Sequence, residues 1–206
     1  MKQRWLSCSG TEELILIFGG WALGAAPFAG LAADSDVLFV DDYHDLGNPL
    51  SDIAQYDRVN LIAFSFGVTS AAHWLAQTGF SPDRLIAVSG TLFPADPARG
   101  IAQDMIRATA DNLTEASFAK FCRRAGLNGP VPEIDPEAAR SELHAVIDRG
   151  NAPEVAFDRI WIPQRDRIIP SSAQEAAWAH QQSSARGIDA PHVPFRDGQS
   201  WREWIA

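Results

Sequence analysis

Cysteine is scarce in this chain of 206 residues, and the two cysteines, Cys8 and Cys122, lie far apart in the sequence. Neither belongs to a Cys-x-x-Cys pair or to a cluster with histidine, so the sequence indicates no zinc site or other metal centre. We therefore expect a reduced protein of the cytoplasm that uses neither a metal nor a cofactor.

Basic residues are also few, with 17 Lys and Arg against 26 Asp and Glu, which gives a formal net charge of −9. This balance argues against a general nucleic-acid-binding protein, because phosphate contacts need a basic surface, although it leaves room for a local basic patch. Internal repeats and low-complexity tracts are absent as well. The length and the hydrophobic fraction of 46% are those of one globular domain with room for a small inserted segment.

One apolar stretch, residues 14–33, resembles a signal peptide or a membrane span. Glu12 and Glu13 stand directly before it, where a signal peptide has positive charge. Gly19, Gly20 and Pro27 interrupt it, as they do in turns. We expect a strand followed by a loop, and no membrane span.

Short apolar runs recur along the chain at the spacing of buried strands. A helical pattern at 66–79 separates two of them, and such alternation indicates an α/β fold with a mostly parallel central sheet. The predicted strands are 14–18, 37–40, 59–64, 85–88 and 155–162, with a weaker one at 188–195.

Residues 94–154 differ from the rest, because prolines divide them and no strand pattern occurs. They predict helices at 101–125, with a break near Asp111, and at 136–149. We expect a helical lid at 94–154 inserted into a core made of 1–93 and 155–206.

The segment Ala63-Phe64-Ser65-Phe66-Gly67 follows a predicted strand and precedes a predicted helix. Small residues two positions either side of a serine are typical of a nucleophile elbow, in which strand and helix pack closely around a strained turn. Ala63 stands where the motif usually has glycine. Two interpretations are open: the segment is a simple strand-to-helix turn that happens to contain serine, or Ser65 is a nucleophile.

A nucleophilic serine needs a base, and the base needs a carboxylate that orients it. In proteins with a nucleophile elbow, the acid and then the histidine follow the serine in the sequence, and the acid lies just past a late strand of the sheet. Asp166 has that position, four residues after Ile162. Asp158 is the weaker candidate, since it lies at the start of the same strand.

Histidine occurs five times, and order along the chain favours His192 as the base. His44, His73 and His144 all precede Asp166, while His180 lies in the helix that follows it and stays the fallback candidate.

Two backbone N–H groups are needed to bind the oxyanion of the reaction. Phe66 follows the nucleophile and supplies one. The loop Gly19-Gly20-Trp21 follows the first core strand, and we expect the N–H of Trp21 to supply the second.

Together these motifs resemble the α/β-hydrolases, and more closely the BioG family of pimeloyl-[acyl-carrier protein] methyl ester esterases. The resemblance includes the Gly-Gly-Trp loop, the Ser65 elbow and, in the helical segment, 111–114 and 121–124. It implies a small α/β-hydrolase with a helical lid that hydrolyses the methyl ester of pimeloyl-acyl carrier protein during biotin synthesis.

The same resemblance implies that arginines of the lid contact the acidic carrier protein. Seven basic residues fall within 94–154, and a basic lid on an acidic body would steer such a partner. Arg123 and Arg124 are the leading candidates, although arginines on helices are usually only solvated.

Two other functions fit the residues. One is a general carboxylesterase or thioesterase of the same fold with no protein partner, and the other is a hydrolase-like protein that binds an acyl chain without turning it over. In each case we expect a monomer.

Overall fold

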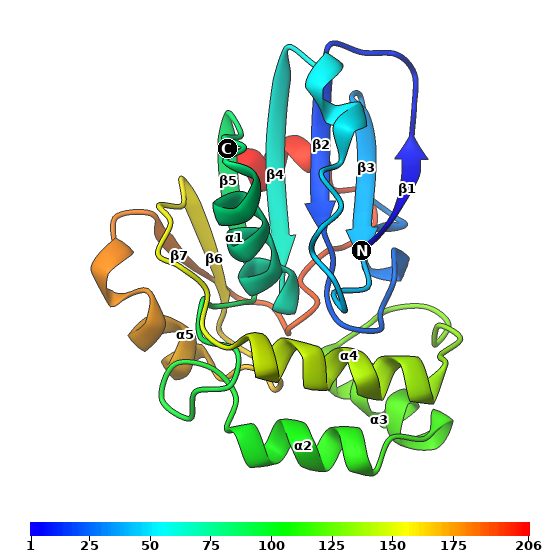
Figure 1. Ribbon diagram of the computed structural model, residues 1–206, viewed down its shortest axis with the longest axis vertical. Helices are drawn as coiled ribbons and strands as arrows, with labels where there is room; N and C mark the ends of the chain where they lie inside the picture. Colours follow the sequence, from blue (N-terminus) through cyan, green and yellow to red (C-terminus); the bar gives the residue numbers. More distant parts are fainter.

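A seven-stranded sheet forms the centre of the computed structural model, which describes residues 1–206 apart from the side chain of Ser51 (Figure 1). The strand order is β1-β3-β2-β4-β5-β6-β7. Every neighbouring pair is parallel except β1 and β3, which are antiparallel. The strands are β1 (Lys2–Ser7), β2 (Glu13–Phe18), β3 (Asp36–Asp41), β4 (Arg58–Phe64), β5 (Arg84–Val88), β6 (Arg159–Pro163) and β7 (Ala185–Ile188).

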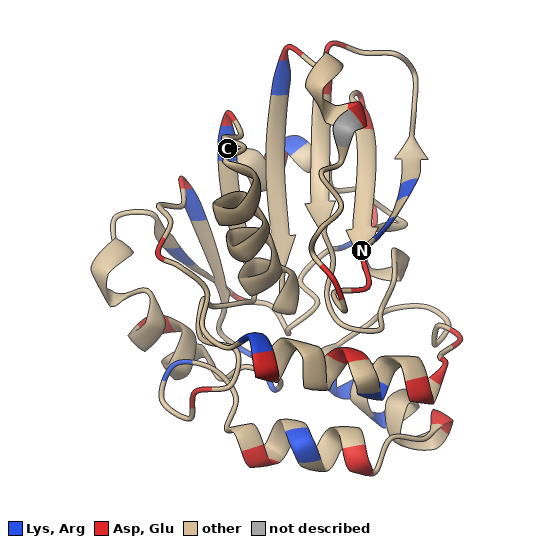
Figure 2. Ribbon diagram, viewed as in Figure 1, with Lys and Arg blue, Asp and Glu red and all other residues tan. Residues whose placement is uncertain are grey.

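The central strands are apolar on both faces, because helices and loops cover the sheet on both sides. Strands β2 to β5 carry their charged residues only at their ends, and Figure 2 shows their middles without charge. Their interior side chains are almost fully excluded from solvent. Burial of these runs fixes the sheet and, with it, the positions at which its strands end.

Helix α1 packs along the sheet, whereas α2, α3 and α4 lie across the end at which the parallel strands finish (Figure 1). These three helices all fall between β5 and β6 in the sequence. The helices are η1 (Ala26–Phe28), η2 (Ser51–Gln55), α1 (Phe66–Thr78), α2 (Gln103–Asp111), α3 (Glu115–Ala125), α4 (Pro136–Arg149), α5 (Ser171–Ala177), η3 (Ala179–Gln181) and α6 (Trp201–Ile205).

The predicted α/β fold with a mostly parallel sheet is confirmed, and three details differ. Strand β1 was not predicted, because it pairs only at the sheet edge and is largely exposed. The strand predicted at 188–195 is wrong: β7 ends at Ile188, and the prolines at 191 and 194 cannot donate to a ladder. The break predicted near Asp111 within 101–125 is present, because α2 ends at Asp111 and Thr114 caps the start of α3, whereas the helical part begins only at Gln103.

The apolar stretch 14–33 forms β2, a turn and η1. Across the described chain, no helix combines the length and the apolar character that crossing a membrane would need.

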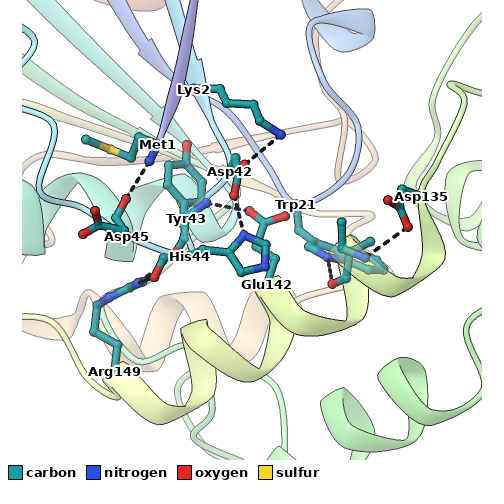
Figure 3. Close-up of polar contacts among 12 residues, drawn as sticks. Met1, Lys2, Trp21, Asp42, Tyr43, His44, Asp45, Asp135, Glu142 and Arg149 are labelled. Atoms are coloured by element: carbon teal, nitrogen blue, oxygen red, sulfur yellow. Dashed lines mark hydrogen bonds and ion pairs between the residues drawn. The ribbon is translucent and has the colours of Figure 1, made fainter.

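Helix α4 is fastened to the loop that follows β3 (Figure 3). Glu142 accepts a hydrogen bond from the backbone N–H of Tyr43 at 3.0 Å, and Arg149 donates to the carbonyl of Tyr43 at 2.5 Å. The Glu142 side chain is buried, with 7% of its surface exposed. Burial raises its pKa to about 7, and the nearby charge of Asp42 acts in the same direction, while the Tyr43 N–H opposes both.

The buried carboxyl of Glu142 makes stability depend on pH. Because its pKa is higher in the folded chain than the ordinary value of 4.5, the folded state holds the proton more tightly. The free energy of unfolding should therefore fall as pH rises from about 4.5 through 7, by on the order of 2–3 kcal/mol. Glu142→Gln removes this titration, so it should unfold like the wild type at pH 5 and be more stable at pH 8.

Chemical denaturation at both pH values measures the difference. Glu137→Gln changes an exposed glutamate of the same helix and serves as the control, with no gain expected at pH 8. An equal pH dependence in the wild type and in Glu142→Gln would contradict the prediction.

Candidate active site

Ser65 lies between the end of β4 and the start of α1, in a conformation that residues other than glycine rarely adopt. Its φ is 56° and its ψ is −127°. Such backbone costs of order 1–3 kcal/mol and is concentrated at functional sites. Its N–H donates to the carbonyl of Val88 at 2.9 Å, which ties the turn to the neighbouring strand β5.

The turn is possible because glycines allow the chain segments around it to approach closely. A Cβ on Gly67 would stand 2.3 Å from the carbonyl oxygen of Phe18, and one on Gly20 would stand 3.2 Å from the Cβ of Ser65. Side chains at these two positions would push the helix and the Gly-Gly-Trp loop away from the serine. Ala63, by contrast, is fully buried with its methyl group accommodated.

Ser65, His192 and Asp166 form one hydrogen-bonded chain. The Nε2 atom of His192 lies 3.0 Å from the Oγ of Ser65, and its Nδ1 atom lies 2.7 Å from Oδ2 of Asp166. The three side chains come from the ends of β4 and β6 and from the loop after β7. The structure thus brings together the three residues that the sequence singled out, and all three are buried.

Asp166 is held by the loop in which it sits. Its Oδ1 atom accepts hydrogen bonds from the backbone N–H groups of Ile168 and Ile169, at 2.8 and 2.9 Å. Its Oδ2 atom is thereby directed towards His192. Gln174 of α5 also donates to Oδ2, at 2.9 Å. Sequence reasoning missed Gln174, because a glutamine in a short helix carries no motif.

The loop that carries His192 is packed against α3. The N–H of Val193 donates to the carbonyl of Ala125 at 2.9 Å, and Gly126 leaves room for Pro191. The ring of His192 also lies 5.2 Å from the ring of Phe64, centroid to centroid. These contacts fix the imidazole from two sides.

The weaker candidates lie elsewhere. Asp158 caps the opposite end of the sheet, where it accepts from the N–H of Leu85. His180 is exposed in η3, and His44 pairs with Asp42 beside α4. His73 and His144 belong to helices α1 and α4.

The residues that carry the two expected oxyanion donors line the same cavity as Ser65. Phe66 is the first residue of α1, and the first N–H groups of a helix have no partner within it. The backbone N–H of Trp21 donates to no acceptor in the described part of the chain. Trp21, Phe66, Ser65 and His192 all line this cavity.

The cavity beside Ser65 has a volume of about 80 Å³ and is mainly apolar. Helices α2, α3 and α4 supply most of its wall, together with Trp21. The indole N–H of Trp21 donates to the carbonyl of Ala139 in α4 at 2.8 Å (Figure 3). The other lining residues are Leu23, Ile101, Met105, Ile106, Thr109, Phe121, Arg124, Leu143 and Ile168.

The two arginines expected at a partner surface, Arg123 and Arg124, lie in the last turn of α3 and are both exposed. Arg124 also reaches the cavity, and its Nε donates to the carbonyl of Arg167 at 2.7 Å. The expectation that the whole segment 94–154 is basic is wrong, since it holds ten acidic and seven basic residues. Only α3 is locally basic, with Lys120 and these two arginines against Glu115.

The parallel sheet, the strained serine at a strand end and the Ser-His-Asp chain define an α/β-hydrolase. The esterase from Exiguobacterium antarcticum has the same fold, with a TM-score of 0.67 over 92% of this chain and 87% of that one, at 16% sequence identity. BioG from Haemophilus influenzae is more similar, with a TM-score of 0.86 and 27% identity over the full length of both chains.

Within this class the chain belongs to the family described as "Pimeloyl-ACP methyl esterase BioG", whose model matches residues 1–204. Its members are carboxylic ester hydrolases. A malonyl-[acyl-carrier protein] O-methyltransferase from Bacteroides fragilis (strain 638R) is 29% identical over 195 residues, which are 88% of this chain. The chain spans only 39% of the length of that protein.

Proposed function

We propose that this chain hydrolyses an acyl methyl ester through Ser65, His192 and Asp166. Ser65 Oγ attacks the ester carbonyl while Nε2 of His192 takes its proton. The same imidazole then gives the proton to the departing methoxide, which leaves as methanol. The acyl group stays on Ser65 as an acyl-enzyme. Water attacks that acyl-enzyme with His192 as the base, and the free acid is released.

The remaining groups stabilise the charges that develop on His192 and on the substrate oxygen. Asp166 keeps the proton of neutral His192 on Nδ1 and stabilises the imidazolium that forms. The N–H groups of Phe66 and Trp21 stabilise the oxyanion, and they do so best in a cavity that excludes water. The observation that carries this proposal is the continuous chain of hydrogen bonds from Asp166 Oδ2 through His192 to Ser65 Oγ.

The proposed substrate is the methyl ester of pimeloyl-acyl carrier protein, in keeping with the family to which the chain belongs. The relative from Bacteroides fragilis supports it, because its name describes the O-methylation of an acyl group on the same carrier. A methyl esterase reverses that type of modification. An apolar cavity with one arginine suits a methylene chain that ends in an ester.

We further propose that residues 94–154 act as a lid, and that Arg123 and Arg124 contact the carrier protein. Three helices of this segment line the cavity beside Ser65, and this supports a lid role. Helix α3 presents its positive charges close to that cavity, where an acidic carrier protein would deliver its acyl chain.

The role of Ser65 is tested by Ser65→Ala. The variant should lose hydrolysis of a short p-nitrophenyl ester by at least 10³-fold, because among the described side chains Nε2 of His192 is hydrogen-bonded to the hydroxyl of Ser65 alone. Its thermal unfolding should stay close to that of the wild type, and His192→Ala should behave in the same way. Turnover retained in Ser65→Ala would exclude Ser65 as the nucleophile, and full activity in His192→Ala would exclude His192 as the base.

The role of the carrier protein is tested by comparing kcat/KM for methyl pimeloyl-carrier protein with that for the free methyl ester. We expect a clear preference for the carrier-bound form that weakens with added salt. Arg123→Ala should raise KM several-fold for the carrier-bound ester and leave KM for the free ester unchanged. Arg186 is an exposed arginine of β7, and Arg186→Ala should change KM for neither substrate.

Equal kcat/KM values for the two substrates would instead favour a general esterase. Rescue of a biotin auxotroph that lacks its own pimeloyl esterase tests the same point in the cell, and failure to rescue with active protein would argue against this substrate.

A further inference from the structure

The side chain of Gln174 is buried against the site and has an unusual balance of hydrogen bonds. It is completely excluded from solvent. Its Nε2 atom donates both to Oδ2 of Asp166, at 2.9 Å, and to the carbonyl of Ile169, at 2.8 Å. Its Oε1 atom is buried and has no hydrogen-bond partner within the described structure.

The orientation of this amide is fixed by the groups around it. If the amide were flipped, Oε1 would face two acceptors, the carboxylate of Asp166 and the carbonyl of Ile169. The observed orientation leaves one buried oxygen unsatisfied, which is unfavourable and calls for an explanation. What the protein gains is a hydrogen-bond donor directed at the carboxylate that orients His192.

Gln174 and His192 share one oxygen of Asp166. Nδ1 of His192 lies 2.7 Å from Oδ2, and Nε2 of Gln174 approaches the same atom. With Ile168 and Ile169 on Oδ1, the carboxylate has four donors and cannot rotate without losing several of them. The amide also withdraws part of the negative charge that His192 would otherwise meet.

We propose that Gln174 is a positioning residue for the catalytic acid: it holds Oδ2 of Asp166 in line with His192 and moderates the basicity of the pair. The inference rests on the proposed roles of Ser65, His192 and Asp166. Gln174 does not touch the substrate, and it acts only through Asp166.

Gln174→Met tests this, because methionine has a similar length and removes only the amide. The Asp166 carboxylate would then lose one donor and stabilise the His192 imidazolium more strongly. The acidic limb of the pH profile of kcat/KM should move to higher pH by about half a unit or more. We also expect kcat to fall roughly tenfold as the carboxylate becomes freer to rotate, with KM little changed.

Other charged groups near the hydrogen-bonded chain are unaltered by this change. Arg124 of α3 lines the cavity with His192, and Arg165 and Arg167 flank Asp166 in its loop. Arg165 is exposed and pairs with Asp189, and Arg167 is also exposed. A shift of the acidic limb in Gln174→Met is therefore assigned to the lost amide.

Gln174→Glu provides a second, independent signature. Two adjacent carboxyl groups share a proton at low pH, and this restores a donor to Asp166; once both ionise, they repel each other. Activity in this variant should approach that of the wild type at the acidic end of the profile and decline as pH rises. It remains informative if Gln174→Met folds poorly.

Gln181→Met is the matched control. The side chain of Gln181 is also hydrogen-bonded, to the carbonyl of Val155 and from the N–H of Phe157, both at 2.9 Å, and to Nε2 of His180 at 3.3 Å, but it lies away from the triad. We expect it to lose stability without moving the acidic limb.

All variants are assayed with a p-nitrophenyl ester, beside Ser65→Ala, and rates are corrected for the folded fraction. Unshifted profiles in both Gln174 variants, with Ser65→Ala inactive, would overturn this inference alone. Activity in Ser65→Ala would overturn the triad and this inference together.

Discussion

The strained backbone of Ser65 is the constraint around which the site is arranged. Its φ of 56° turns the chain from β4 into α1 within one residue, so Oγ projects beyond the end of the sheet. This turn forces α1 so close to β2 that position 67 accepts only glycine. It also places the N–H of Phe66 in the first turn of the helix, where such groups have no partner within the helix, as the proposed oxyanion donor requires. The proposed nucleophile and one proposed oxyanion donor therefore depend on the same turn.

The rest of the site is linked to the helical segment across the end of the sheet. The loop of His192 is bonded to the end of α3 through Val193, and the indole of Trp21 is bonded to α4 through Ala139. Edge-to-face packing of Trp21 on Phe121 adds to this attachment. The segment that lines the cavity thus also holds the loop of His192, the proposed base, and that of Trp21, the proposed second oxyanion donor.

Sequence reasoning locates strands and candidate site residues where a local pattern marks them. The apolar runs predicted the parallel strands, and the elbow and the end of β6 indicated Ser65 and Asp166. Sequence reasoning fails where tertiary contacts determine the structure or the pKa of a residue. The exposed strand β1 has no apolar pattern, and the burial that raises the pKa of Glu142 arises only when α4 docks. The role proposed for Gln174 depends on its hydrogen bond to Asp166, eight residues earlier, which no sequence motif indicates.

The central claim is that Ser65 is activated by His192, and covalent labelling with a fluorophosphonate tests it most directly. The probe reacts with an activated serine and needs no knowledge of the natural substrate. Intact-mass analysis and peptide mapping of the folded wild type should show one adduct, on Ser65, and His192→Ala should label far more slowly. An unlabelled Ser65 in folded wild-type protein, or equal labelling in His192→Ala, would contradict the account, the first outcome favouring a protein that only binds acyl chains.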